Sequence, residues 1–389
     1  MSKQTPDNCT ACTTCTAYCP ISKATRNFRG PKMTGPAFER FRYLHKGEED
    51  ALSYCSNCKN CDIACPNGVP ISVFNMLAKA ETSQGLRLFA RDYIVAHGDL
   101  FYSFLRYFPS FLVNFGMLNP LTRIFLDRIG VARRAALPAF CDKPFLKRLN
   151  AVKQPQTDEK VIFFPGCYVN MYDPEAGLAL VKLLNRLNVE VVAPEGLVCC
   201  GVPLISSGFY KECKKNAEKN LKILSKYRGA PIITVCPSCA LMIKHDYAEL
   251  FPEIAAKDIK IVDPSEFILE HQNLKNLEFE EESRKLSYHS PCHQRALGIG
   301  KPALELMKLL PSTAVCDLDA GCCGISGSYG FKKEKYRISL SVGKNLFDSL
   351  KAADTELALT ECGTCKVQIT ANTRIKTVHP LSLLAERLI

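Results

Sequence analysis

The chain has 389 residues, of which 47% are hydrophobic, 23% are charged and 21 are cysteines, and its formal net charge is +11. This length and composition are typical of a globular protein with two or three domains and a sizeable core. Because the chain is too long to need disulfide staples and its first residues, MSKQTPDNCTACTTC, contain no apolar signal segment, we expect reduced thiols that ligate metal.

Two cysteine runs near the N-terminus share one spacing. In CTACTTCTAYCP and CSNCKNCDIACP the pattern is C-x2-C-x2-C-x3-C-P, the spacing of bacterial ferredoxins, in which the fourth cysteine of each run ligates the cluster of the other run. The spacing predicts two cubane 4Fe-4S clusters, one held by Cys9, Cys12, Cys15 and Cys65, the other by Cys55, Cys58, Cys61 and Cys19. The alternative is a pair of zinc knuckles, but these use C-x2-C pairs at wide separation and need no third cysteine or Cys-Pro step.

Short helices are predicted around these runs. Phe38 to Leu44 has the pattern of a short amphipathic helix, and the stretch ISVFNMLAKAETSQG repeats apolar residues at helical spacing up to a stop at Gly85. We therefore expect residues 1–95 to form a mainly helical domain with two clusters.

Residues 96–155 are predicted to connect this domain to the rest of the chain. Tyr107 to Thr122 carries no charge over 16 residues, but Pro109, Gly116 and Pro120 interrupt it, and a bilayer span needs about 20 apolar residues. From His97 to Lys153, nine Lys and Arg and three Asp and Glu alternate with Phe and Tyr residues. Two interpretations stay open: the segment lies in a membrane interface, or it is a helical hairpin packed on a partner subunit or on the chain's own core.

The positive charge is concentrated in the same part of the chain. Residues 1–153 hold 21 Lys and Arg against 11 Asp and Glu, which is +10 of the total. A basic face suits nucleic acid, an acidic protein or an anionic membrane, or it offsets the negative charge of bound clusters. Because the basic residues are dispersed among apolar ones, we expect no nucleic-acid partner.

The rest of the chain is a tandem repeat. KVIFFPGC aligns with KLSYHSPC, LVCCGVP with AGCCGIS, and ITVCPSC with LTECGTC, at offsets of 125, 123 and 126 residues. Each copy alternates short β-rich runs with helices such as PEAGLALVKLLNRL and PALELMKLL, which predicts a βαβαβ unit with parallel strands. The expected fold is thus α+β multidomain: a helical ferredoxin-like domain, then two duplicated α/β domains at residues 156–280 and 281–389.

Every cysteine group of the repeat comes directly after a predicted strand. Since the carboxyl ends of parallel strands meet at one edge of a sheet, each copy brings five thiols together. The first set is Cys167, Cys199, Cys200, Cys236 and Cys239, and the second is Cys292, Cys322, Cys323, Cys362 and Cys365. A Cys-Cys pair that serves one site needs a sharp turn, which the following glycine permits. Five thiolates exceed what one zinc ion or one cubane requires, which indicates sulfurs that bridge two irons.

Several other residues have weaker signals. Cys141, Cys213 and Cys316 belong to no set and are predicted to be inert. His289 and His293 flank Cys292 and are candidates to donate hydrogen bonds to cluster sulfur or to relay protons, with capping or packing as the alternative. The stretch GISGSYG lacks the dinucleotide-binding pattern. Without a flavin or nicotinamide fold, we predict no catalytic residue on this chain and place substrate oxidation on a partner.

The duplicated Cys…CCG…CxxC unit resembles the CCG domain of heterodisulfide reductase subunits, of lactate and glycolate oxidase iron-sulfur subunits, and of the iron-sulfur subunit family of anaerobic glycerol-3-phosphate dehydrogenases. Nearly the whole chain resembles the last of these, through GPKMTGP, GCYVN, CCGVPLISSGF, HSPCH, CCGISGSYGFKKEKY, CGTCKVQI and HPLSLLA. The resemblance implies up to two further 4Fe-4S clusters, of the noncubane kind, at the five-cysteine sites.

The resemblance also implies a function. An electron-transfer subunit would receive electrons from a flavoprotein that oxidises sn-glycerol 3-phosphate to dihydroxyacetone phosphate, and would pass them to membrane quinone, such as menaquinone. It would lie peripherally on the cytoplasmic face of the inner membrane, without a transmembrane helix. Three alternatives remain: a lactate or glycolate oxidase subunit, a heterodisulfide-reductase-like catalyst that cleaves a disulfide itself, and a noncatalytic membrane anchor whose clusters are structural.

Overall fold

The N-terminal cysteine runs fold into two similar loops in the computed structural model, which describes residues 6–41, 50–81, 86–254 and 259–389. Thr13 and Lys59 hold equivalent positions and both adopt left-handed backbone, with φ of 65° and 63°, directly before a one-turn helix. The elements of this part are η1 (Pro6–Asn8), α1 (Thr14–Ala17), α2 (Pro20–Ala24), η2 (Met33–Ala37), α3 (Phe38–Phe41), η3 (Asp50–Tyr54), α4 (Asn60–Ile63) and α5 (Ile71–Glu81).

Two helices predicted here are present as far as the structure describes them. Helix α3 begins at Phe38, and residues 42–44 of the predicted helix lie outside the described residues. Helix α5 begins at Ile71 and buries seven of its eleven residues. Its predicted stop at Gly85 also falls outside the described residues.

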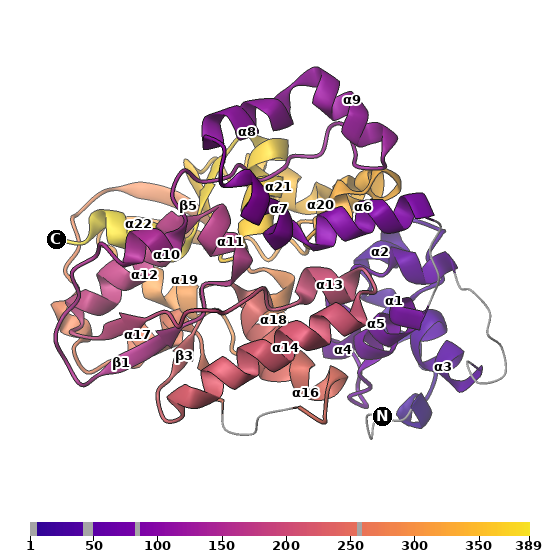
Figure 1. Cartoon of the computed structure of the whole chain (residues 1–389), viewed down its shortest axis with the longest axis horizontal. Helices are drawn as coiled ribbons and strands as arrows, with labels where there is room; N and C mark the ends of the chain where they lie inside the picture. Colours follow the sequence, from indigo (N-terminus) through magenta and orange to yellow (C-terminus); the bar gives the residue numbers. More distant parts are fainter. Residues whose placement is uncertain (1–5, 42–49, 82–85, 255–258) are drawn as a thin grey trace.

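The connecting segment consists of helices that run over one side of the molecule, where α8 and α9 lie at the top of Figure 1. These helices are α6 (Leu86–Ala96), α7 (Gly98–Leu105), α8 (Ser110–Leu118), α9 (Pro120–Arg128) and α10 (Phe145–Leu149). On α8 and α9 the large apolar side chains point outward: Phe115 is 70% exposed, and Leu118 and Leu121 are each 76% exposed. The hairpin therefore does not pack these side chains on the chain's own core, which removes one of the two interpretations of a packed hairpin.

Each copy of the repeat forms a four-stranded parallel sheet. The strand orders are β2-β1-β3-β4 and β6-β5-β7-β8, so the second sheet repeats the topology of the first. The strands are β1 (Lys160–Phe163), β2 (Glu190–Val192), β3 (Ile232–Ile233), β4 (Ile261–Val262), β5 (Arg284–Tyr288), β6 (Thr313–Asp317), β7 (Leu357–Leu359) and β8 (Lys376–Val378). The predicted fold class is confirmed. The βαβαβ pattern accounts for three strands of each sheet, and the fourth strand is an addition.

The helices of the two units cover the sheet faces. In the first unit they are α11 (Gly166–Met171), α12 (Pro174–Arg186), α13 (Val202–Ser206), α14 (Tyr210–Leu224), η4 (Ser225–Tyr227), α15 (Pro237–Leu241), η5 (Met242–Asp246), α16 (Tyr247–Leu250) and α17 (Pro264–Glu270). After η6 (Leu274–Asn276), the second unit has α18 (Cys292–Leu297), α19 (Pro302–Met307), η7 (Tyr329–Phe331), α20 (Lys333–Ala352), α21 (Gly363–Thr373) and α22 (Pro380–Arg387).

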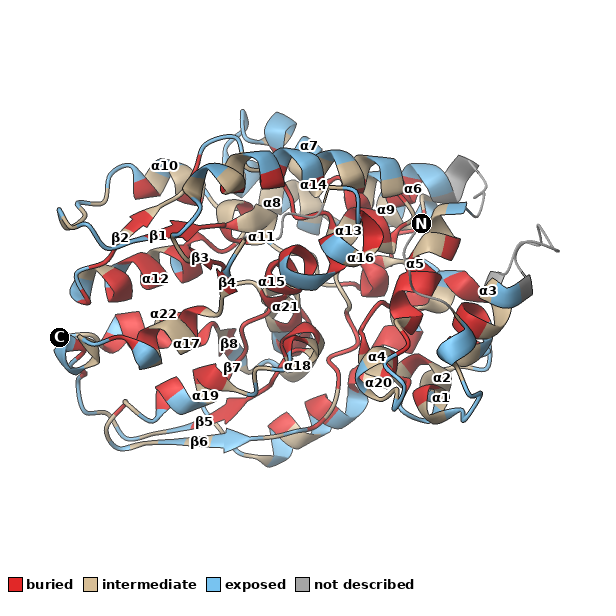
Figure 2. Ribbon diagram, turned by 90° about the horizontal axis from the view of Figure 1, so that it is seen from below, coloured by how far each residue is buried: buried red, intermediate tan, exposed pale blue. Residues whose placement is uncertain are grey.

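The two units pack against each other through equivalent helices. Helix α12 contacts α22, and α17 contacts α19. Since α12 and α19 hold matching places in the repeat, as do α17 and α22, the two contacts are related by an approximate two-fold axis. One buried apolar cluster, which includes Leu180, Leu306 and Leu384, runs through this interface. Figure 2 shows the buried residues concentrated on the strands and on the facing sides of these helices.

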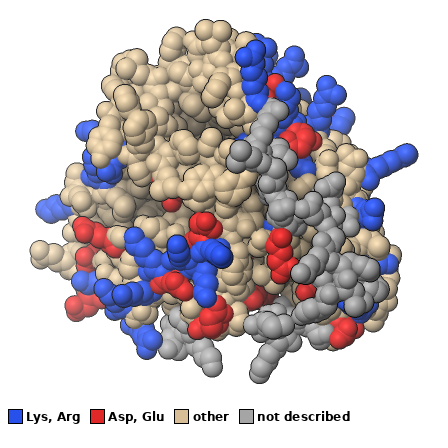
Figure 3. Space-filling view, turned by 45° about the vertical axis from the view of Figure 1, so that its right-hand side comes forward, with Lys and Arg blue, Asp and Glu red and all other residues tan. Residues whose placement is uncertain are grey.

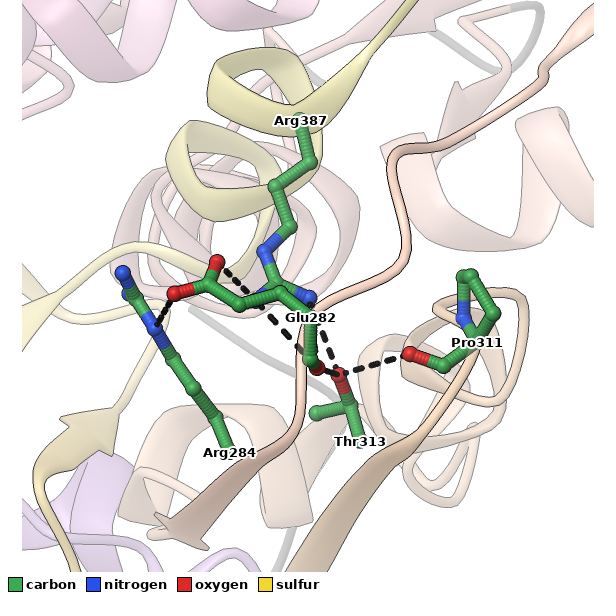
Figure 4. A network of polar contacts seen from close by, with 5 residues as sticks. All are labelled: Glu282, Arg284, Pro311, Thr313 and Arg387. Atoms are coloured by element: carbon green, nitrogen blue, oxygen red, sulfur yellow. Dashed lines mark hydrogen bonds and ion pairs between the residues drawn. The ribbon is translucent and has the colours of Figure 1, made fainter.

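A polar network holds the last helix against the second sheet (Figure 4). Arg387, on α22, is 3% exposed and donates a hydrogen bond of 3.0 Å to Oγ1 of Thr313 at the start of β6. Its guanidinium also pairs with the Glu282 carboxylate, which in turn pairs with Arg284 on β5. A buried guanidinium requires such partners because an unpaired charge in the interior is costly.

Candidate metal centres

The structure brings the first predicted cluster set together around one cavity. Cys9, Cys12, Cys15 and Cys65 line a space of about 300 Å³, although Cys65 belongs to the other cysteine run. Burial, and then the nearby charges of Cys9 and Cys65, raise the pKa of Cys15. The exchange of the fourth cysteine that the spacing predicts is therefore compatible with the fold.

The second set has the same arrangement. Cys19, Cys55, Cys58 and Cys61 line a space of about 310 Å³, in which Cys19 comes from the first run. Burial is the main cause that raises the pKa of Cys58 and of Cys61. Four soft sulfur donors around each cavity fit an iron-sulfur cluster, because thiolates select such clusters over hard cations.

The five cysteines of the first CCG unit form a chain of contacts at the carboxyl edge of its sheet. Sγ of Cys167, which follows β1, lies 3.7 Å from Sγ of Cys199. Sγ of Cys200 lies 3.3 Å from Sγ of Cys239, and Cys239 contacts Cys236. Hydrogen bonds from the neighbouring thiols of Cys199 and Cys239 lower the pKa of Cys200 to about 6, because they stabilise its thiolate.

The second unit repeats this chain in the same order. Sγ of Cys323 lies 2.9 Å from Sγ of Cys365, which contacts Cys362, while Cys322 contacts Cys292. A hydrogen bond from Cys365 is the main cause that lowers the pKa of Cys362 to about 6. Each unit thus presents five converging sulfur atoms, and the donor set fits an iron-sulfur cluster with bridging thiolates.

The glycine after each Cys-Cys pair adopts the conformation that the turn requires. The φ angles are +96° at Gly201 and +82° at Gly324, in the region that favours glycine. There is also no room for a side chain: a Cβ at Gly201 would lie 2.6 Å from Sγ of Cys213, and one at Gly324 would overlap the carbonyl oxygen of Ser339. Cys213 is thus a buried packing residue of this turn.

The remaining two unassigned cysteines lie elsewhere. Cys316 is exposed on β6, and Cys141 is partly buried beside Tyr102. Neither belongs to the sulfur chains described above.

The two candidate histidines have different surroundings. His289 is 3% exposed, and one of its ring nitrogens lies within 4.8 Å of both the Cys323 and Cys365 sulfurs. Its Nε2 has no hydrogen-bond partner within the described part of the chain. The matching position of the first unit is Phe164, whose backbone N–H makes the same kind of hydrogen bond to the adjacent strand. The first site therefore has an apolar ring where the second has an imidazole.

His293 instead joins three segments. Its Nδ1 lies 2.8 Å from Oγ of Ser238, between Cys236 and Cys239, and its Nε2 lies 2.9 Å from the carbonyl oxygen of Asn57 in the second ferredoxin run. Beside it, the buried ammonium of Lys59 lies 2.7 Å from Asp246. Burial lowers the pKa of Lys59, but the Asp246 charge and other carboxylates more than offset this and raise it.

These contacts place the cysteine sets in a continuous series that the sequence did not reveal. Cys58 of the second ferredoxin set lies near Cys322 and Cys292 of the second CCG set. Cys362 of that set in turn lies near Cys236 of the first CCG set. Because these neighbours are far apart in sequence, no local pattern could have indicated that they are close.

Comparisons with known proteins agree with these features. Residues 5–69 match the 4Fe-4S dicluster domain, and residues 161–244 and 286–370 each match the cysteine-rich domain family. The chain is 34% identical to an iron-sulfur relative from Escherichia coli K12, a subunit of the anaerobic glycerol-3-phosphate dehydrogenase, over 98% of each chain.

More distant relatives belong to other enzymes. The chain is 25% identical to a subunit of the fumarate reductase (CoM/CoB) of Methanothermobacter marburgensis, over 93% of this chain and 67% of that protein. It is 28% identical to lactate utilization protein A 2 of Bacillus cereus Q1, over 59% of this chain and 99% of that protein.

Proposed function

Because the chain belongs to the family of this anaerobic glycerol-3-phosphate dehydrogenase subunit, we propose that it is the electron-transfer subunit of such a dehydrogenase. A flavoprotein partner would oxidise sn-glycerol 3-phosphate to dihydroxyacetone phosphate, and this chain would carry the electrons to a quinone. The cysteine-rich character is common to the family, whereas the substrate comes from the glycerol-3-phosphate dehydrogenase relatives alone.

The observation that carries this proposal is the continuous series of four cysteine sets. Cys9, Cys12, Cys15 and Cys65 would hold one cubane 4Fe-4S cluster, and Cys19, Cys55, Cys58 and Cys61 the other. The two five-cysteine sets would hold up to two noncubane 4Fe-4S clusters. Clusters of these kinds accept and release electrons one at a time. The protein's part is to bury the sets and to hold them side by side, through residues such as His293.

The exposed face of α7–α9 supports attachment to the cytoplasmic face of the inner membrane. Its large apolar side chains are Phe104, Tyr107, Phe108, Phe111, Leu112, Phe115, Leu118, Leu121 and Phe125. In Figure 3 the upper part of the molecule is almost free of charged side chains, and Lys and Arg gather along one side of it. Among the described residues, none of the helices combines the length and the apolar character that a bilayer span demands. Peripheral attachment by amphipathic helices agrees with both features.

The function is tested by the choice of electron donor. The complex is purified anaerobically from its own membranes, and reduction of a menaquinone analogue is measured with glycerol 3-phosphate, lactate or glycolate. We expect activity with glycerol 3-phosphate only. Activity with lactate or glycolate alone would retain electron transfer and discard the glycerol-3-phosphate assignment. Inactivity with all three donors, together with reduction of a disulfide by the chemically reduced chain, would favour the heterodisulfide-reductase-like alternative.

A further inference from the structure

A cleft of about 520 Å³ lies between helices α7 and α8 and the segment 140–147. Three aromatic rings line it, those of Tyr102, Phe108 and Phe140, together with the aliphatic side chains of Leu105 and Val113. This volume and this mostly apolar, partly polar lining are those of a small-molecule site.

The walls of the cleft are fixed by hydrogen bonds. The side chain of Asn114 on α8 makes two bonds of 2.9 Å with the backbone of Phe140, as donor to its carbonyl oxygen and as acceptor from its N–H. The Ser110 hydroxyl donates a further hydrogen bond to the Asp142 carboxylate across the cleft. These contacts hold α8 against segment 140–147, so the cavity is preformed.

The cleft is connected to the first CCG set by a series of aromatic rings. Tyr102 stacks on Phe140 with ring centroids 5.8 Å apart, and Phe140 contacts Tyr172 at 5.0 Å. Tyr172 in turn lies close enough to Cys167 for the thiolate charge to act on its hydroxyl. In addition, the N–H of Cys141 donates a hydrogen bond of 3.0 Å to the carbonyl oxygen of Met171, on the helix that carries Cys167.

The cleft is also continuous with the exposed apolar face of α7–α9. Phe108 belongs to both, and Phe104 contacts it at 5.7 Å between ring centroids. Lys143 and Lys147 also line the cleft and are exposed, which provides cations for oxygen atoms of a ligand. A ligand that fits must therefore have a flat apolar ring, polar oxygens and access from a lipid phase.

We propose that this cleft binds the ring of a quinone, an inference that rests on the proposed electron-transfer function and adds a site to it. The bound quinone takes two electrons from the reduced protein and two protons from water, and both of its carbonyl groups become the hydroxyl groups of the quinol. The reductant is the substrate of the flavoprotein partner. The first CCG set, through Cys167 and Tyr172, is then the last cysteine set before the acceptor.

The test uses tryptophan fluorescence, because the chain contains no Trp and quinones quench indole emission. The full-length, cluster-loaded protein is prepared with Phe108→Trp in the cleft or, as the matched control, with Phe115→Trp, which lies on α8 outside the cleft lining. A menaquinone analogue is titrated into each. We expect saturable quenching at position 108 and linear quenching at position 115. Equal quenching at both positions would mean general partition onto the apolar face and would overturn the proposal.

A second pair of variants tests the volume of the cleft. In the Phe108→Trp protein, Val113→Phe fills the cleft, whereas Leu118→Phe adds the same ring type at an exposed site on the same helix. We expect Val113→Phe to weaken quinone binding about tenfold or more, a change of roughly 1.4 kcal/mol, and Leu118→Phe to leave it unchanged. Equal affinities would refute the site. Circular dichroism and the cluster absorbance check that each variant is folded.

The binding assay needs no electron donor, so its outcome is separate from that of the proposed function. If saturable quenching is present but glycerol 3-phosphate fails as a donor, the site stands and the assignment of the partner falls. If glycerol 3-phosphate supports quinone reduction but the cleft variants neither quench nor change the quinone KM, the site is wrong and the function stands.

Discussion

The Tyr168 hydroxyl in the first CCG unit donates a hydrogen bond of 2.8 Å to the carbonyl oxygen of Gly363 in the second. Tyr168 follows Cys167, and Gly363 follows Cys362, so the bond joins a cysteine loop of each unit. The Tyr168 ring also occupies the space that a Cβ at Gly363 would need. The two five-cysteine sites therefore share a wall and are one structural unit rather than two independent domains.

The shared wall predicts that Gly363→Ala damages both CCG sites. The added methyl group would overlap the Tyr168 ring, and such overpacking costs roughly 1–3 kcal/mol. We expect a lower melting temperature and less iron bound per chain. The double variant Tyr168→Leu/Gly363→Ala removes the ring and should recover part of the loss. Wild-type iron content and stability in the single variant would contradict the shared wall.

The two glycines near the second Cys-Cys pair allow a matched comparison. Gly324 and Gly321 both have left-handed backbone, with φ of +82° and +89°, but a Cβ meets the Ser339 carbonyl at Gly324 and open space at Gly321. Gly321→Ala should cost only the conformational strain, about 1–2 kcal/mol. Gly324→Ala should cost more and should lose the iron of the second site, measured by iron analysis and electron paramagnetic resonance. Equal effects of the two changes would show that close packing at Gly324 is unimportant.

The cysteine sets and the parallel sheets could be predicted because they depend on local pattern. The ferredoxin spacing and the position of each CCG cysteine after a strand need no knowledge of distant residues. Strand β4 is only two residues long and strand β8 three, too short for a pattern of period two to stand out. Their places are decided by the sheet to which they are added.

Features that depend on long-range packing could not be predicted. The sequence marks His289 and His293 as equivalent flanks of Cys292, yet the fold places one beside the Cys323 and Cys365 sulfurs and uses the other to bind Asn57 and Ser238. The contact depends on where the second ferredoxin run docks, which no spacing within the repeat encodes. The cleft beside Tyr102 likewise forms from three separate segments.

The exchange of the fourth cysteine between the ferredoxin runs predicts a crossed phenotype. Cys19→Ser should remove the cluster of the second run, because Cys19 lines the cavity of Cys55, Cys58 and Cys61. Cys65→Ser should in turn remove the cluster of the first run. Electron paramagnetic resonance of each reduced variant, compared with Cys9→Ser and Cys55→Ser, distinguishes the two signals. If Cys19→Ser instead resembles Cys9→Ser, each run holds its own cluster.

The difference between His289 and Phe164 predicts that the two CCG centres have different reduction potentials. A ring N–H of His289 that donates to a cluster sulfur or a cysteine sulfur stabilises the reduced, more negative state and so raises the potential. His289→Phe gives the second site the residue of the first, and we expect a redox titration followed by electron paramagnetic resonance to show the midpoint of one centre at lower potential. Phe164→His is the matched reciprocal change and should raise the midpoint of the other centre. An unchanged midpoint in the folded, iron-loaded His289→Phe protein would show that this histidine only packs.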